Sequence, residues 1–204
     1  GAGVRKEPTM HLRPFLVMTA LATAALLSGC LIPEHFSAKI DIQPDASLDY
    51  SYEGTAIDPM AMLKMQRQGI LSDKEQQSLA AEAQKLRQNP DVKKAVYMGK
   101  ARYQLEMEGR RKAGEPLKLL DMLSVQSSHD GVMTIAVQPV KRKEKADLAQ
   151  MGVLINGSLR VNVPEGAEVI SHNANNAPAS GSGSYTWRIG EVGVRPEIKL
   201  RFNP

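Results

Sequence analysis

A two-residue alternation of apolar and polar side chains constrains the fold of this chain more than any other feature. It is clearest over residues 101–108, where Ala, Tyr, Leu and Met alternate with Arg, Gln and Glu. Residues 36–43 and 48–55 alternate in the same way on either side of a Pro-Asp-Ala-Ser turn. Because successive side chains of a strand point to opposite faces of its sheet, each segment is predicted to be a half-buried strand. The two segments around the turn are predicted to form an antiparallel hairpin.

Helix start and stop signals follow the first hairpin. A helix is predicted over residues 59–69, because a proline stands in its first turn and a glycine follows its last. Ser72 and Glu75 form a capping box, which predicts a second helix that runs to about residue 88. A short helix is predicted over 115–123, and a brief polar helix over 143–151.

Short apolar segments bounded by turn residues fill the rest of the chain. Further strands are predicted at 92–97, 124–127, 132–140, 153–155, 158–163, 169–173, 185–189 and 197–202. Asn156-Gly157 is interpreted as the turn between two of these strands, since this dipeptide favours hairpin turns. The expected fold class is α+β, a mostly antiparallel sheet with two or three helices in a single domain.

The N-terminal segment has the order of a secretory signal. Residues 15–27 form an uncharged, mostly apolar run that follows three basic residues, at positions 5, 6 and 13. A membrane-spanning helix needs roughly 20 apolar residues, so this run is too short for a comfortable permanent span. The run ends in Leu27-Ser28-Gly29-Cys30, and Cys30 is the only cysteine of the chain. This order resembles the lipobox signal of bacterial lipoproteins, and the alternative is a buried cysteine after a hydrophobic helix.

The lipobox resemblance implies how the chain is processed. Residues 1–29 are then a cleaved signal peptide, with 1–9 as an upstream extension, and 30–204 form the lipoprotein domain. The thiol of Cys30 would carry a diacylglycerol and its amino group a further acyl chain, as stable anchoring needs at least two chains. Leu31 replaces the aspartate that retains enterobacterial lipoproteins at the inner membrane. In a host with two membranes, the expected location is therefore the outer membrane, facing the periplasm.

Composition excludes several other classes of protein. Residues 30–204 contain 23 basic and 21 acidic residues, a balance that does not favour nucleic acid as a partner. Because the only cysteine is assigned to lipid, the domain is expected to have no disulfide and no cysteine metal site.

Catalytic motifs are not recognisable in the domain. Its three histidines are widely separated, and none has the i, i+4 partner of a zinc-hydrolase helix. They are His35, His129 and His172. The expectation is a protein that is not an enzyme and that has no metal and no cofactor.

Two basic clusters and a group of methionines are candidate binding features. The clusters are Arg110, Arg111 and Lys112, and Lys141, Arg142 and Lys143. Each follows a predicted strand, so both are expected at one end of the sheet, where they could bind anionic headgroups. The alternative is a pair of solvated loops that discourage edge pairing. The methionines at 60, 62 and 65 either close the core or line an adaptable apolar groove.

The C-terminal part resembles a known family. The sequences GSLRVNVP at 157–164, SHNA at 171–174 and YTWRI at 185–189 are similar to the strand layout of LppM-like bacterial lipoproteins. This resemblance implies a non-enzymatic lipid- or glycolipid-binding module anchored in the cell envelope. The alternative is a structural or protein-interaction lipoprotein of envelope assembly, with an envelope protein as its partner.

Overall fold

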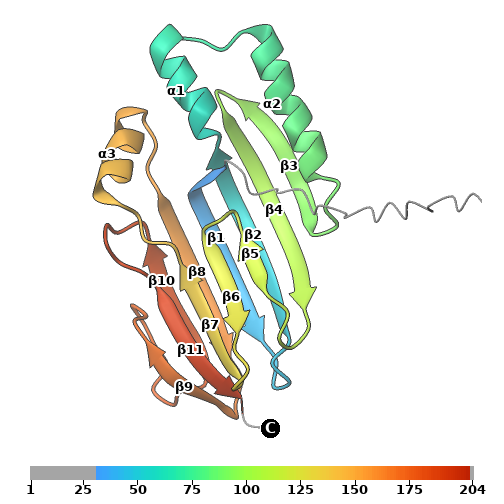
Figure 1. The fold of residues 1–204 in the computed structure, drawn as a ribbon, viewed down its shortest axis with the longest axis vertical. Helices are drawn as coiled ribbons and strands as arrows, with labels where there is room; N and C mark the ends of the chain where they lie inside the picture. The colour runs from blue at the N-terminus through green and yellow to red at the C-terminus, as the bar shows by residue number, and fades with distance from the viewer. Residues whose placement is uncertain (1–30, 203–204) are drawn as a thin grey trace, which may run out of the picture.

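Eleven strands and three helices form within residues 31–202, the part of the chain that the computed structural model describes (Figure 1). The strands make two sheets. The six-stranded sheet has the order β10-β8-β1-β2-β4-β3, with β1 at Ile32–Ile42, β2 at Leu48–Ile57, β3 at Val92–Gly99, β4 at Arg102–Arg111, β8 at Asn156–Val163 and β10 at Gly183–Ile189. The five-stranded sheet has the order β5-β6-β7-β11-β9, with β5 at Leu117–Leu119, β6 at Leu123–Ser127, β7 at Val132–Val137, β9 at Ala167–His172 and β11 at Glu197–Phe202. The α+β prediction is confirmed.

The six-stranded sheet has one buried face and one polar face. On β1, Ala38 and Ile40 are buried, whereas Ser37 and Lys39, which alternate with them, are exposed. The buried face packs against the five-stranded sheet, which contributes Val125, Ile135 and Leu200 among others to the same core. The sequence alternates because one face of this sheet is buried against the second sheet and the other face is exposed.

The three helices lie beside the sheets. They are α1 at Pro59–Gln68, α2 at Asp73–Leu86 and α3 at Arg142–Gln150. The α2 helix runs along β3 and buries Leu79, Ala83 and Leu86 in the main core. The α1 and α3 helices share a second, smaller core with Ile57 and Ala101, where β2 ends and β4 is about to begin. We call this edge of the molecule, where β1 begins, the helical end, and the opposite edge the far end (Figure 1).

Side-chain caps fix where α1 and α2 begin. The Asp58 carboxylate accepts a hydrogen bond from the Ala61 backbone N–H at 3.0 Å. The Ser72 hydroxyl accepts one from the Glu75 N–H at 3.2 Å and donates to the Glu75 carboxylate at 3.0 Å. These bonds satisfy backbone donors that have no partner inside the helix. The capping-box prediction is confirmed, and α2 ends at Leu86, slightly before the predicted position.

The predicted helix over 115–123 is wrong. Residues 117–119 form the short strand β5, and the chain then turns back into β6. Leu120 and Asp121 make this turn with φ angles of 48° and 50°. The spacing of the leucines fits a helix or a strand. Pairing with β6 favours the strand, because Leu117 and Leu119 then both reach the core.

The hairpin expected around Asn156-Gly157 is also wrong. Residues 153–155 form no strand, and Asn156 and Gly157 are the first residues of β8. The strand pairs in parallel with β1, which places Gly157 beside Phe36. A Cβ atom at Gly157 would lie 2.1 Å from the Phe36 ring, so the glycine is needed for close packing and not for a turn.

Candidate functional site

An apolar groove of about 380 Å³ opens at the helical end, between the two sheets. Its walls include Leu31, Ile32, Met60, Met122, Val140 and Ile189. They come from β1, α1, the β5–β6 turn, the segment after β7, and β10. Asp121, Gln138 and Glu144 add polar groups to this lining. A mostly apolar hollow of this size with a few polar groups is typical of small-molecule and lipid sites.

Three prolines help to make the groove. Pro33, Pro59 and Pro139 all line it, and each removes a backbone N–H that could extend a strand or helix. The pairing of β1 with β2 is irregular directly after Pro33, and β7 ends two residues before Pro139. The regular strand pairing is therefore interrupted after Pro33 and has ended before Pro139, beside the groove.

Leu120 is held in a strained backbone conformation at the groove wall. A positive φ angle costs roughly 1–2 kcal/mol for a residue other than glycine. The turn is fixed on both sides, because the Met122 N–H donates to the Leu119 carbonyl at 2.9 Å and the Gln138 N–H donates to the Met122 carbonyl at 2.8 Å. Strain of this kind is concentrated at functional sites. This part of the groove was not predicted from the sequence, because a helix was expected over residues 115–123.

The three methionines of α1 have different environments. Met62 is buried in the smaller core and Met65 is half-buried against it, whereas 67% of Met60 is exposed. Met60 lines the apolar groove and also a second hollow of about 470 Å³ between α1 and α2. The two interpretations of these methionines, core and groove, are therefore both realised on one helix.

A buried ion pair connects three strands near the groove. Glu34 on β1 is only 3% exposed and accepts hydrogen bonds from Arg102 Nε at 3.0 Å and Nη2 at 2.9 Å. The Thr55 hydroxyl on β2 also donates to it at 3.2 Å. Burial alone would raise the pKa of Glu34, but the hydrogen bonds and the charge of Arg102 outweigh it and hold that pKa below its ordinary value. Because its oxygens are satisfied, this carboxylate connects strands and is not a free acid or base.

The two basic clusters lie at opposite ends of the molecule, so the expectation of a common end is wrong. Arg110 and Arg111 are the last residues of β4, and Lys112 follows them at the far end. Lys141 precedes α3, and Arg142 and Lys143 begin it, at the helical end. The reason is strand direction: β4 runs away from the helical end and β7 runs toward it (Figure 1).

The arginines of the far-end cluster already have partners. Arg110 Nε lies 2.7 Å from the Asp49 carboxylate, and Arg111 Nη1 lies 3.1 Å from that of Asp91. The Arg111 guanidinium also sits 5.3 Å from the centre of the Tyr50 ring. At the helical end, Lys141, Arg142 and Lys143 are exposed and form no ion pair with the carboxylates of residues 31–202. The helical-end cluster is therefore the better candidate for an anionic partner.

The structure does not bring the three histidines together. His172 accepts a hydrogen bond from the Ala174 N–H at 3.1 Å and packs its ring edge against Tyr185, which is a structural role. Among the residues that the structure describes, no three His, Cys, Asp or Glu side chains are close enough to hold a metal ion. Cys30, the expected lipidation site, lies outside the described residues.

The polar face of the six-stranded sheet has a hollow of its own, of about 520 Å³. Its charged lining residues are Lys39, Glu53, Lys93, Glu106, Glu108 and Arg160. Glu53 and Glu106 lie directly opposite each other on β2 and β4, although like charges in this position destabilise a sheet. We refer to this feature as the polar hollow.

The fold and site define an α+β domain of two packed sheets with an apolar groove at one end. No helix within residues 31–202 is both long and apolar enough to cross a bilayer. No protein-family model matches the chain, and no curated protein matches it. Among solved structures, the NMR structure of the folded domain of LppM from Mycobacterium tuberculosis is similar, with a TM-score of 0.42 and 12% sequence identity. The similarity covers 88% of this chain and 95% of that one.

Proposed function

We propose that this chain is a bacterial cell-envelope lipoprotein, anchored through lipid on Cys30, whose domain binds an acyl chain of a lipid or glycolipid without catalysing a reaction. The apolar groove is the observation that carries this proposal. Its volume and mostly apolar lining suit a hydrocarbon chain, since burial of methylene groups contributes about 0.8 kcal/mol each. Asp121, Gln138 and Glu144 could hydrogen-bond the hydroxyl groups of a headgroup.

The position of the groove supports the same proposal. Leu31 and Ile32 line it, and they directly follow the cysteine of the lipobox-like sequence. In a host with two membranes, we propose the outer membrane as the location, because Leu31 stands where the inner-membrane retention signal has aspartate. The groove would then lie close to the lipids that it binds.

Lipid co-purification tests the binding proposal. The fragment 31–204 contains the described helices and strands and both hydrophobic cores, so it can be expressed without the signal segment. We expect mass spectrometry of organic extracts to find bound lipid on this fragment. Met60→Glu, at an exposed position of the groove wall, should remove most of that lipid because it places a charge against the acyl chain.

Ile170→Glu is the matched control, since Ile170 is exposed on β9 and does not line the groove. It should leave the lipid content unchanged. Absence of lipid from the unmodified fragment, or equal lipid on Met60→Glu and Ile170→Glu, would contradict binding in the groove.

Metabolic labelling tests the anchor separately. A fatty-acid analogue should label the full chain and should not label Cys30→Ala. Equal labelling of the two would refute lipidation at this position, whatever the groove binds.

The polar hollow favours a protein-interaction role as the second candidate. The polar hollow is lined by charged side chains of both signs, which could pair with charged side chains of a partner protein. A photo-crosslinker at Ser51, which lines the polar hollow, should then capture an envelope protein in intact cells. Recovery of no protein partner would count against this role.

A further inference from the structure

The distance between the proposed lipid anchor and the folded domain is very short. Leu31 already packs against the main core, and β1 begins at Ile32. Consecutive Cα atoms are about 3.8 Å apart, so a lipid on Cys30 would leave no spacer between the bilayer and Leu31. The domain could not then turn freely above the membrane, and one end of it must face the lipid.

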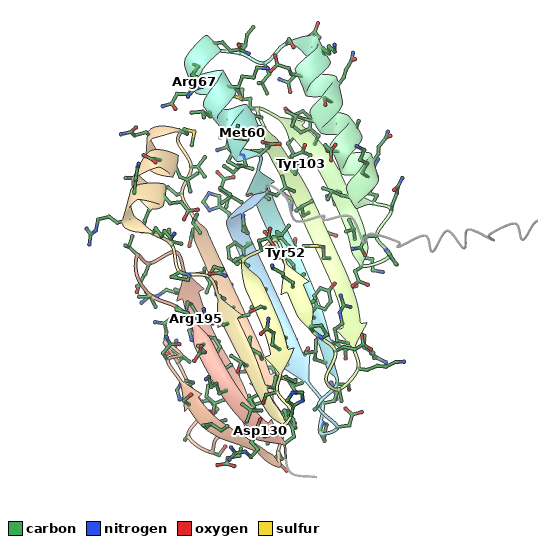
Figure 2. All side chains as sticks on the ribbon, viewed as in Figure 1. Tyr52, Met60, Arg67, Tyr103, Asp130 and Arg195 are labelled. Atoms are coloured by element: carbon green, nitrogen blue, oxygen red, sulfur yellow. The ribbon has the colours of Figure 1, made fainter. Side chains whose placement is uncertain are left out.

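The surface of the helical end has the apolar character that contact with a bilayer requires. Within residues 31–202, seven large hydrophobic side chains are exposed. Four of them lie at the helical end: Met60 at 67%, Ile70 at 78%, Met98 at 58% and Leu154 at 58%. Ile70 lies in the turn between α1 and α2, and Leu154 lies between α3 and β8. The turns at the far end carry polar residues: Asp45 lies in the turn between β1 and β2, and Asp130 lies in the turn between β6 and β7 (Figure 2).

The helical end also carries basic side chains that are free of ion pairs in the described structure. Arg67 lies near the end of α1, at the top of Figure 2, and Lys141, Arg142 and Lys143 begin α3. All four are exposed, and none lies within 4.0 Å of a carboxylate oxygen in residues 31–202. Each Lys or Arg close to an anionic membrane surface strengthens binding about fivefold. Apolar and basic groups together match the interface of an anionic bilayer.

We propose that the helical end docks on the surface of an anionic phospholipid bilayer, with Ile70 and Leu154 in the interface and the apolar groove facing the leaflet. This inference rests on the proposed function and deepens it, because a lipid could then pass between leaflet and groove without crossing water. The far end, with its paired arginines, points away from the membrane.

Vesicle binding by the unanchored fragment 31–204 tests the docking surface without the anchor. The fragment should co-sediment with vesicles of phosphatidylethanolamine and phosphatidylglycerol, and more weakly with vesicles of phosphatidylcholine. Ile70→Glu should lower its affinity about tenfold, because burial of one large apolar side chain is lost. Arg142→Glu should weaken binding only to the anionic vesicles. Lys112→Glu, at the far end, should leave binding to both kinds of vesicle unchanged.

Orientation is tested on the lipidated chain that begins at Cys30, in the anionic vesicles. Cys30 is the only cysteine of the chain, and its thiol would be blocked by lipid in this material, so one introduced cysteine accepts one fluorescent label. The label on Ile70→Cys should be quenched by brominated lipids, and the label on Lys112→Cys should not. Equal quenching at the two positions, or stronger quenching at Lys112, would overturn the docking surface.

The failure of each proposal has its own signature. A failed anchor appears as equal metabolic labelling of Cys30→Ala, and a failed groove appears as a fragment that purifies without lipid. The docking surface itself is refuted when Ile70→Glu and Lys112→Glu bind the anionic vesicles equally well.

Discussion

Tyr52 offers a direct test of core packing, because its hydroxyl is buried and has no hydrogen-bond partner among residues 31–202. The side chain is 1% exposed and stacks on Phe36 with ring centres 5.5 Å apart. Its oxygen has no hydrogen-bond partner within the described residues, and burial raises its pKa above the ordinary value. A buried polar group without a partner costs about 1–3 kcal/mol. We therefore expect Tyr52→Phe to stabilise the protein by about 1–2 kcal/mol, since the ring and its stacking remain.

Tyr103 provides the matched control, as it is equally buried and lies on β4, the strand next to β2 (Figure 2). Its hydroxyl donates to the Leu79 carbonyl of α2 at 2.8 Å. Tyr103→Phe breaks this bond and should destabilise the protein by about 1 kcal/mol. Loss of the hydroxyl is thus expected to raise the free energy of unfolding at Tyr52 and to lower it at Tyr103.

Urea unfolding of the fragment 31–204 measures both effects. The midpoint should rise for Tyr52→Phe and fall for Tyr103→Phe at an unchanged m-value. In a domain of this size, 1 kcal/mol corresponds to a shift in Tm of about 2–4 °C. If Tyr52→Phe is as destabilising as Tyr103→Phe, the Tyr52 hydroxyl has a partner, and the reasoning fails.

Three further substitutions test other parts of the structure. Glu34→Gln should cost roughly 2 kcal/mol near neutral pH, as Arg102 is partly exposed. Because the folded pKa of Glu34 is depressed, its stabilisation is present above the ordinary pKa of 4.5 and is lost as pH falls through the folded value. Stability of Glu34→Gln should therefore vary less between neutral and acid pH, and parallel pH curves would contradict this. Gly157→Ala should cost about 2 kcal/mol in urea unfolding because of the clash with Phe36, and no loss would show that the ring can move. Ser72→Ala should cost about 1 kcal/mol and speed hydrogen exchange in the first turn of α2, and unchanged exchange would exclude the cap.

Local chemistry in the sequence predicted much of the fold. The alternation in 36–43, 48–55 and 101–108 identified β1, β2 and β4, because one face of each is buried and the other is not. Proline at the start of α1 and the Ser72 cap of α2 identified two helices, since each acts on backbone groups next to it. Features that depend on neighbours in sequence were thus predictable.

Features that depend on residues far apart in the sequence could not be predicted from it. The bond between Glu34 and Arg102 joins residues 68 positions apart, and neither residue stands out in the sequence. The sequence alone suggested a turn at Gly157. The reason for a glycine there is the Phe36 ring, which reaches Gly157 only when β1 pairs with β8. The groove likewise depends on segments from across the chain that meet only in the folded domain. The methionines of α1 suggested an apolar groove but could not locate it.

The parallel pairing of β1 and β8 leaves one edge of β1 open during much of the synthesis of this protein. Ser37 and Ser158 are neighbours across these strands although 121 positions separate them in the chain. As a chain emerges from a ribosome or translocon, β1 can pair with β2 at once, but its other edge stays open until β8 arrives. Non-local pairing is slow, and an open strand edge invites aggregation. The edge of β1 that pairs with β8 is therefore unprotected for longer than the edge that pairs with β2.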